Sequence, residues 1–292
     1  MSAFDDIAAL VRARSGLALG PDKVYLVDSR LTGIAQRLGH KDYTGLASRL
    51  ATDRALQDEV VEALTTNETL FFRDNKPFEH LRTSGLPRLH GERPAGRPLR
   101  VWSAAASTGQ EAYSLAMMIA EMGPALQGRM VQIVGTDIAR AALARAREGL
   151  YSQFEVQRGL PAKLLVKYFA KEANGWRVSR QIRDMVEFRE WNLLAEPTGL
   201  GTFDIVLCRN VLIYFDVPTK TRVLNLLASR LAPGGLLYLG GAETINGLGS
   251  PFQAIAGQVS VFEVPSATRE APGASSLPLP RLPQGVRPVA LT

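Results

Sequence analysis

The chain has 292 residues, of which 46% are hydrophobic and 21% are charged, and its formal net charge is +6. This length predicts two soluble domains with a sizeable core. The single cysteine, Cys208, excludes an intrachain disulfide and is expected to pack in the core, and the histidines lack metal-ligand spacing, so no metal site is expected. The N-terminus does not resemble a signal peptide and no apolar run could span a bilayer, which favours a cytoplasmic location.

The first third of the chain has the apolar spacing of helices. Apolar residues recur at three- and four-residue intervals over 4–89, which predicts an N-terminal helical domain at 1–90. Arg30 and Arg37 lie seven positions apart and share one helix face, either an ordinary solvated face or a docking surface. Residues 92–98 (ERPAGRP) cannot continue a helix and predict a linker.

After the linker, short apolar strands alternate with amphipathic helices, which is typical of a parallel sheet covered on both faces. We expect an α/β domain over 91–265 and, from the alternation within 174–184, a small antiparallel β insertion at about 170–188. The Pro-rich residues 266–292 are expected to form a disordered tail. The expected strands are 99–105, 130–137, 186–188, 203–208, 236–239 and 260–264, and the expected helices are 110–121, 139–147, 160–169 and 219–231.

Basic residues exceed acidic ones most strongly between residues 156 and 183, where Glu172 is the one acidic residue. This excess indicates either the solvated face of a helix and a hairpin or a docking surface for an acidic partner, because local charge attracts opposite charge and speeds encounter. The basic residues are Arg158, Lys163, Lys167, Lys171, Arg177, Arg180 and Arg183.

Ligands of open α/β sheets bind beyond the carboxyl ends of the strands, so the residues there are candidates for the site. The first expected strand is followed by a turn of small residues, 103–111, which lacks the GxGxxG pattern of dinucleotide sites. Small residues still allow close approach of a ligand without phosphates, such as the amino-acid and ribose parts of S-adenosylmethionine. Glu111 would then pair with the amino group of that ligand.

The other strand ends carry polar residues as well. Asp137 follows the second strand, where it either accepts hydrogen bonds from both ribose hydroxyls or caps the next helix. Asn192 and Leu193 follow the third strand and could bracket an adenine. Arg209 and Asn210 end the fourth strand, and a cation so close to the core needs a partner.

Several motifs extend this pattern beyond the strand ends. They are TTNETLFFRD at 65–74, RVWSAAASTGQEAYS at 100–114, GTDI at 135–138, NLL at 192–194 and FDIVLCRNVLIYFD at 203–216. In this order they resemble the chemotaxis-receptor glutamate methyltransferases, the CheR family, and the resemblance covers about residues 5–264. It implies a Rossmann-like S-adenosylmethionine-dependent methyltransferase sheet, with the helical domain and the β insertion appended. It also implies methyl transfer to a glutamate γ-carboxylate of a methyl-accepting chemoreceptor, which leaves S-adenosylhomocysteine.

The resemblance also implies roles for individual residues. Arg73 and Tyr214 would be the catalytic, acceptor-side residues, although without the resemblance Tyr214 would be assigned to the core. Gln110 stands where the family often has glutamate, and we expect the change to be tolerated because Glu111 remains. The implied cofactor-binding residues are Asn67, Thr69, Arg73, Glu111, Asp137, Asn192, Leu193, Arg209 and Asn210. The residues expected to dock the receptor are Arg30, Arg37, Arg177, Arg180 and Arg183.

The implied partner is the cytoplasmic domain of the chemoreceptor, with membrane contact only through it and no nucleic acid. Because residues 171–176 are short and have one glycine, tethering to a receptor C-terminal pentapeptide is doubtful. A glutamate side chain with a pKa of about 4.3 is already ionised at neutral pH, so the reaction needs no general base. Two alternatives remain open at this point: a methyltransferase for another acceptor, and an adaptor that binds S-adenosylmethionine without turnover.

Overall fold

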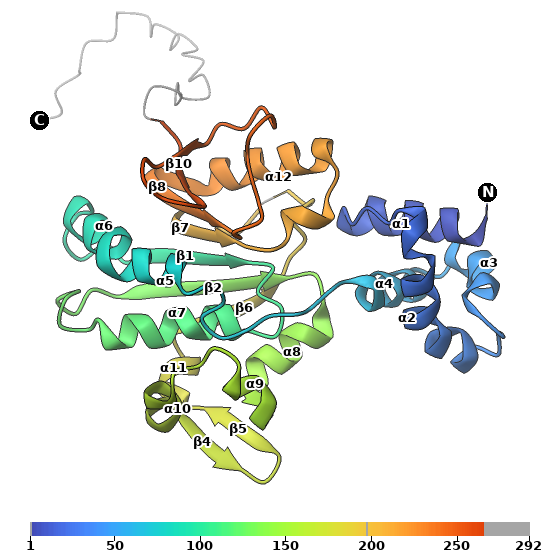
Figure 1. Cartoon of the computed structure of the whole chain (residues 1–292), viewed down its shortest axis with the longest axis horizontal. Helices are drawn as coiled ribbons and strands as arrows, with labels where there is room; N and C mark the ends of the chain where they lie inside the picture. The colour runs from blue at the N-terminus through green and yellow to red at the C-terminus, as the bar shows by residue number, and fades with distance from the viewer. Residues whose placement is uncertain (1, 197, 266–292) are drawn as a thin grey trace, which may run out of the picture.

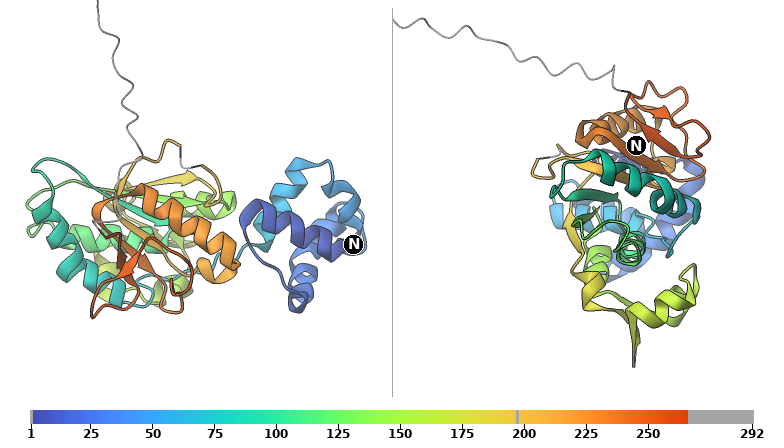
Figure 2. Two further views of the ribbon diagram at one scale, coloured as in Figure 1. Left: turned by 90° about the horizontal axis from the view of Figure 1, so that it is seen from above. Right: turned by 90° about the vertical axis from the view of Figure 1, so that its left-hand side faces the viewer.

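The computed structural model describes residues 2–196 and 198–265. The expected Pro-rich tail, 266–292, lies outside the described residues. The chain forms a helical domain and an α/β domain, which stand side by side and are joined by the segment that follows residue 64 (Figures 1 and 2). No helix within the described ranges is long and apolar enough to cross a membrane.

Capping residues in the sequence define several of the helix ends in the N-terminal domain. The helices are α1 (Ala3–Ser15), α2 (Val24–Arg37), α3 (Ala47–Leu50) and α4 (Arg54–Leu64), with 3-10 turns η1 (Pro21–Lys23) and η2 (Tyr43–Leu46). Ser2 and Asp5 form a capping box at the start of α1, and Gly16 ends this helix with φ +80°. Asp53 accepts a backbone N–H at the start of α4. The buried faces of α1, α2 and α4 share one apolar core.

The helical domain ends earlier than the expected boundary at residue 90. Helix α5 (Lys76–His80), the π-helix η3 (Leu81–Gly85) and helix α6 (Leu86–Glu92) belong to the α/β domain. Their apolar residues Phe78 and Leu89 are buried in the same core as the central strands. Sequence periodicity predicts that a segment is helical but not which core buries its apolar face, so it placed this boundary too late.

The expected α/β sheet is confirmed. Its strands are β1 (Leu99–Ala104), β2 (Val131–Asp137), β6 (Val186–Glu190), β7 (Phe203–Cys208), β8 (Leu231–Leu239), β9 (Gln253–Ala254) and β10 (Val261–Glu263). Among the described residues they form a seven-stranded sheet in the order β6-β2-β1-β7-β8-β10-β9. The strands from β6 to β8 are parallel, and β10 runs antiparallel to β8 and β9. Strand β8 starts at Leu231 rather than at the expected residue 236, and its pairing with β7 is irregular between Phe203 and Ile205.

Alternate residues of each strand face opposite sides of the sheet. Val101 and Ile205 pack in one core with helices α7 (Gln110–Glu121) and α8 (Arg140–Glu148). Trp102 and Val206 pack in a second core on the other face, under helix α12 (Val217–Arg230). Helices cover both faces of the sheet (Figure 1). The polar residues at the carboxyl ends of the strands are therefore left to line a site there.

The small antiparallel insertion is larger than expected and begins earlier. It joins β3 (Leu150–Tyr151), β5 (Gly175–Val178) and β4 (Phe169–Glu172) in a separate sheet, with helices α9 (Gln153–Gln157), α10 (Ala162–Tyr168) and α11 (Arg180–Arg183). We call residues 150–183 the insertion; it lies beyond α7 and α8 in Figure 1. Residues 180–183 form a helix rather than a strand, and Val186 onward belongs to the main sheet. A two-residue strand such as β3 is too short to show alternation, which is why the sequence missed it.

Candidate active site

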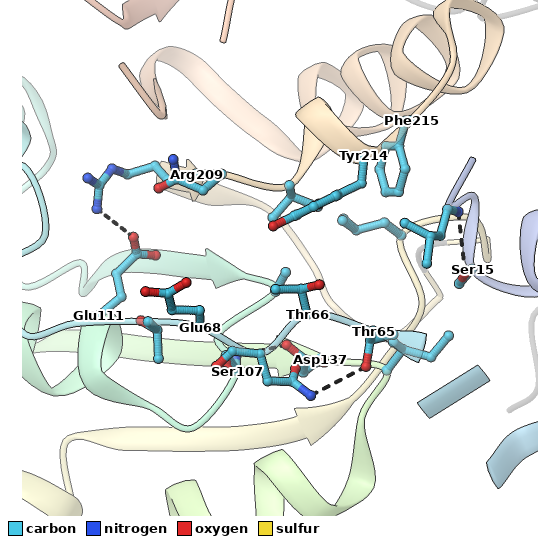
Figure 3. A pocket seen from close by; sticks show the side chains of 18 of the residues that line it. Ser15, Thr65, Thr66, Glu68, Ser107, Glu111, Asp137, Arg209, Tyr214 and Phe215 are labelled. Atoms are coloured by element: carbon cyan, nitrogen blue, oxygen red, sulfur yellow. Dashed lines mark hydrogen bonds and ion pairs between the residues drawn. The ribbon is translucent and has the colours of Figure 1, made fainter. Parts of the chain in front are cut away.

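A pocket lies where the strand order reverses, at the carboxyl ends of β1 and β7, as expected for a doubly wound sheet. The segment between α4 and α5, which we call the pocket loop (residues 65–75), forms another wall. Ser15 and Leu17 of the N-terminal segment complete the lining. Figure 3 shows these walls, with Asp137 and Ser107 opposite Tyr214 and Phe215.

The turn after β1, which we call the glycine turn (residues 105–109), folds back on itself. Ala105, Ser107 and Gly109 have φ of +58°, +52° and +94°, a region that only glycine adopts freely. A methyl group on Gly109 would lie 3.0 Å from the side chain of Ala146 and 3.1 Å from the ring of Phe188, so helix α7 starts tightly against its neighbours. This packing brings the backbone of the turn to the wall of the pocket without a bulky side chain.

Asp137 joins the end of β2 to the glycine turn. Its carboxylate accepts the N–H of Ser107 at 2.7 Å and the N–H of Ala139 at 2.9 Å, so it holds the backbone at the start of α8 while it lines the pocket. Burial raises the pKa of the Asp137 carboxyl above its ordinary value, and the backbone N–H groups oppose that shift. Each carboxylate oxygen can accept more than one hydrogen bond, so acceptor capacity remains toward the cavity.

Glu111 and Arg209 form a buried ion pair, with Nη1 of Arg209 2.9 Å from Oε2 of Glu111 (Figure 3). The other Glu111 oxygen accepts the hydroxyl of Ser103 at 2.8 Å. The second Arg209 nitrogen, Nη2, donates to the Arg73 carbonyl at 2.6 Å and to Asp74 at 2.9 Å. The expectation that a cation after β7 needs a partner is confirmed, and this cation ties the pocket loop to α7.

The side-chain amides of Asn192 and Asn210, which follow two of the strands, differ in whether their hydrogen-bonding groups have partners. Asn192 donates to the Arg14 carbonyl at 2.5 Å and accepts the N–H of Leu194 at 2.9 Å. Its side chain therefore links the sheet to the helical domain, although it also lines the pocket beside Leu193. The Oδ1 atom of Asn210 is buried and has no hydrogen-bond partner among the described residues. A buried acceptor without a donor is rare in proteins, so a water molecule or a ligand is expected to supply one.

The residues implied by the TTNET and VLIYF motifs come together in the same pocket. Asn67, Thr69, Arg73 and Tyr214 all line it. Arg73 donates to the backbone carbonyl of Glu68 at 3.2 Å. In Figure 3 the Tyr214 side chain extends over the cavity from the segment before α12.

Some functional positions carried no signal in the sequence. The carbonyl of Tyr214 accepts the N–H of Ala18 at 3.0 Å, and Leu17 forms an isolated antiparallel bridge with Phe215, so the N-terminal segment covers this side of the pocket. Glu68 also lines the pocket (Figure 3), and its largely exposed carboxylate pairs with Arg158 of the insertion at 3.3 Å. Residue 68 belongs to the motif at 65–74, but the environment of its side chain depends on the tertiary fold.

Glu243 is a further residue that the sequence did not indicate. Its buried carboxylate accepts the backbone N–H groups of Asn210, Val211, Leu212 and Gly240 at 2.6 to 2.9 Å. These hydrogen bonds hold the turn in which Asn210 adopts φ +59°. Glu243 thus fixes the segment that runs from Arg209 toward Tyr214.

The basic residues expected to dock a partner have different surroundings. Arg30 donates to the Thr65 carbonyl at 2.6 Å and to the Ala63 carbonyl at 3.3 Å, so it holds the start of the pocket loop rather than a solvated face. Arg37 pairs with Glu59, and Arg177 pairs with Glu172. Arg183 is half-buried, with its Nε unpartnered among the described residues, whereas the Arg180 side chain is 87% exposed.

Cys208 is fully buried, and burial raises the pKa of its thiol well above the ordinary value. The thiol is therefore neutral and unreactive at physiological pH, as expected for a residue that packs in the core.

Two family models together match nearly the whole described chain: "CheR methyltransferase, all-alpha domain" over residues 2–65 and "CheR methyltransferase, SAM binding domain" over residues 67–261. Chemotaxis protein methyltransferase Cher2 of Pseudomonas putida is 41% identical over 258 residues, which cover 86% of this chain and 94% of that protein. Chemotaxis protein methyltransferase 1 of Pseudomonas aeruginosa is 43% identical over 257 residues, or 86% and 93% of the two chains. A protein of the same name from Vibrio cholerae is 38% identical over 257 residues, or 86% and 92%.

Proposed function

The chain belongs to the CheR methyltransferase family and binds S-adenosylmethionine, and from this premise we propose that it methylates glutamate side chains in the cytoplasmic domain of chemoreceptors. The single observation that carries the proposal is that Arg73 and Tyr214, the expected acceptor-side residues, line the same pocket as Glu111 and Asp137. A cytoplasmic location and a chemoreceptor partner are parts of this proposal.

The residues of the pocket fit the cofactor. The unpartnered Oδ1 of Asn210 is an acceptor for an ammonium group, and the Glu111 carboxylate adds negative charge near it. Asp137 retains acceptor capacity for ribose hydroxyls, and Ile138 and Leu193 supply apolar surface for an adenine. When bound, S-adenosylmethionine supplies a methyl group that passes from its sulfur to a carboxylate oxygen, which leaves S-adenosylhomocysteine.

Side chains of the pocket would orient the acceptor rather than remove a proton from it. A glutamate with a pKa of about 4.3 is ionised at neutral pH, so it is already a nucleophile. In the proposed mechanism Arg73 orients the acceptor carboxylate by a charge-assisted hydrogen bond, and the Tyr214 hydroxyl donates to it. Alignment of this kind lowers a barrier by up to about 7 to 11 kcal/mol.

The proposal is tested by measuring how much of the transferred methyl label is released by base. The purified protein is incubated with methyl-labelled S-adenosylmethionine and membranes that contain methyl-accepting chemoreceptors, and the separated products are treated with base. Carboxyl methyl esters release volatile methanol, whereas N-methyl and C-methyl products do not. We expect receptor-dependent volatile label that is lost in Arg73→Ala and kept in Arg82→Ala, because Arg82 is exposed and lies outside the pocket.

Two outcomes would contradict the proposal. Base-stable label would assign the enzyme to another acceptor. Binding of S-adenosylhomocysteine without any transfer, with receptors that a related enzyme does methylate, would favour an adaptor.

A further inference from the structure

The pocket loop is strained and therefore depends on its surroundings. Phe72, Asp74 and Asn75 have φ of +49°, +65° and +42°, although none is glycine. Such conformations persist only where neighbouring groups enforce them. On one side the loop is held by the sheet domain: Arg209 donates to the Arg73 carbonyl, and the N–H of Phe72 donates to Ser114 at 2.9 Å.

On the other side, the insertion holds the loop. The Phe71 side chain is fully buried and meets the rings of Tyr151 and Phe169 edge-on, with centroid distances of 5.0 and 5.7 Å. Gly159 of the insertion has φ +84°, and its backbone lies so close to Phe71 that an added methyl group would overlap the Phe71 carbonyl oxygen. An exposed ion pair between Arg158 and Glu68, at 3.3 Å, lies in the same contact.

Tyr151 connects this contact to a second wall of the pocket. Its hydroxyl donates to the Thr108 carbonyl at 2.7 Å, so the ring that touches Phe71 also holds the glycine turn. Tyr151 lies in β3 and pairs with Trp176 of β5, so it is part of the small sheet itself. One buried side chain of the insertion therefore contacts both the pocket loop and the glycine turn.

We infer that the insertion sets the geometry of the cofactor pocket, and that Tyr151 and Gly159 are positioning residues that act through Phe71 and Thr108. None of Tyr151, Gly159 and Phe71 lines the pocket, so each acts through the backbone it supports. The inference concerns the pocket of the proposed function but depends only on cofactor binding. Its test needs no acceptor, so a failure of receptor methylation would leave it standing.

The test compares Gly159→Ala and Tyr151→Phe with Gly128→Ala in the full chain. Gly128 has a similar left-handed conformation, φ +73°, but an added methyl group there meets no atom within 4 Å, so the control shares the backbone strain without the contact. Tyr151→Phe keeps the ring against Phe71 and removes only the hydrogen bond to Thr108. Affinity for S-adenosylhomocysteine is measured by calorimetry, and amide hydrogen exchange by mass spectrometry reports on residues 65–75.

We expect Gly159→Ala to weaken S-adenosylhomocysteine binding about tenfold or more and Tyr151→Phe about threefold, with the control within about twofold of the unmodified protein. Exchange over residues 65–75 rises in Gly159→Ala and not in the control. If Gly159→Ala fails to fold, the affinity of Tyr151→Phe decides alone. Unchanged affinity in the folded variants, or weakening equal to that of the control, would overturn the inference.

Discussion

Arg209, directly after β7, and Glu111 of α7 are brought together from positions 98 residues apart, and their side chains are almost completely buried, with exposures of 1% and 11%. Ser103 satisfies the second Glu111 oxygen, and the carbonyl of Arg73 satisfies Nη2 of Arg209. The pair therefore joins helix α7 to the pocket loop, and a cofactor that approaches Glu111 meets a carboxylate whose position is already fixed.

Removal of one member of this pair should destabilise the folded protein. In Arg209→Ala, Glu111 stays buried without its cation, so we expect the free energy of unfolding to fall by about 3–5 kcal/mol. Urea unfolding measures it, with Arg180→Ala as the control because the Arg180 side chain is 87% exposed and its pairing with Asp184 is weak in water. Equal losses in the two variants would show that the buried pair does not contribute as described.

Cofactor binding should depend on pH through Asp137. Burial raises the pKa of this carboxyl above 3.8, so in the window between 3.8 and the raised pKa the folded protein binds more protons than the unfolded chain, and stability falls as pH rises. A ligand that donates hydroxyl groups prefers the ionised form. Affinity for S-adenosylhomocysteine should therefore increase as pH rises through the raised pKa and then level off.

Asp137→Asn provides the control for that pH dependence. Its side chain has no charge to lose, so calorimetry over the same pH series should give weaker binding without this slope. A slope that survives in Asp137→Asn would assign the titration to another group.

Glu243→Gln should disturb the turn after β7. The glutamine has a single acceptor oxygen, so some of the N–H groups of Asn210, Val211, Leu212 and Gly240 lose their partner. We expect a loss of about 2 kcal/mol or more in unfolding free energy, together with weaker S-adenosylhomocysteine binding. Glu263→Gln is the matched control, because the Glu263 side chain is 40% exposed and pairs with Arg88 across the surface. Similar effects of the two changes would contradict the role given to Glu243.

Of the arginines proposed to dock the receptor, Arg180 is the one to test by charge reversal. Arg30 supports the pocket loop and Arg177 is already paired, so their substitution would also change the fold locally. We expect Arg180→Glu to lower kcat/KM for receptor methylation about threefold at low salt, with a smaller effect at high salt, because ions screen exposed charges. Cofactor affinity should stay unchanged, and Arg82→Glu serves as the reversal control. The same kcat/KM as the unmodified protein at low salt would rule out this docking role.

The sequence by itself determined the elements of the α/β domain and the residues at its strand ends. Alternation of short apolar strands with helices is a local property, and parallel strands bring Glu111, Asp137 and Arg209 to one edge whatever the loops do. The resemblance of the motifs also pointed to Arg73 and Tyr214, and both residues line the pocket.

Only the tertiary structure decided how these residues are used. The amide of Asn192 is engaged by Arg14 of the helical domain, and Arg30 supports the pocket loop instead of facing solvent. The roles of Glu243 and Tyr151 arise from buried contacts between segments 31 to 43 residues apart. Periodicity and motif spacing report which residues lie near each other along one element, whereas the partner of a buried polar group is fixed by packing between elements.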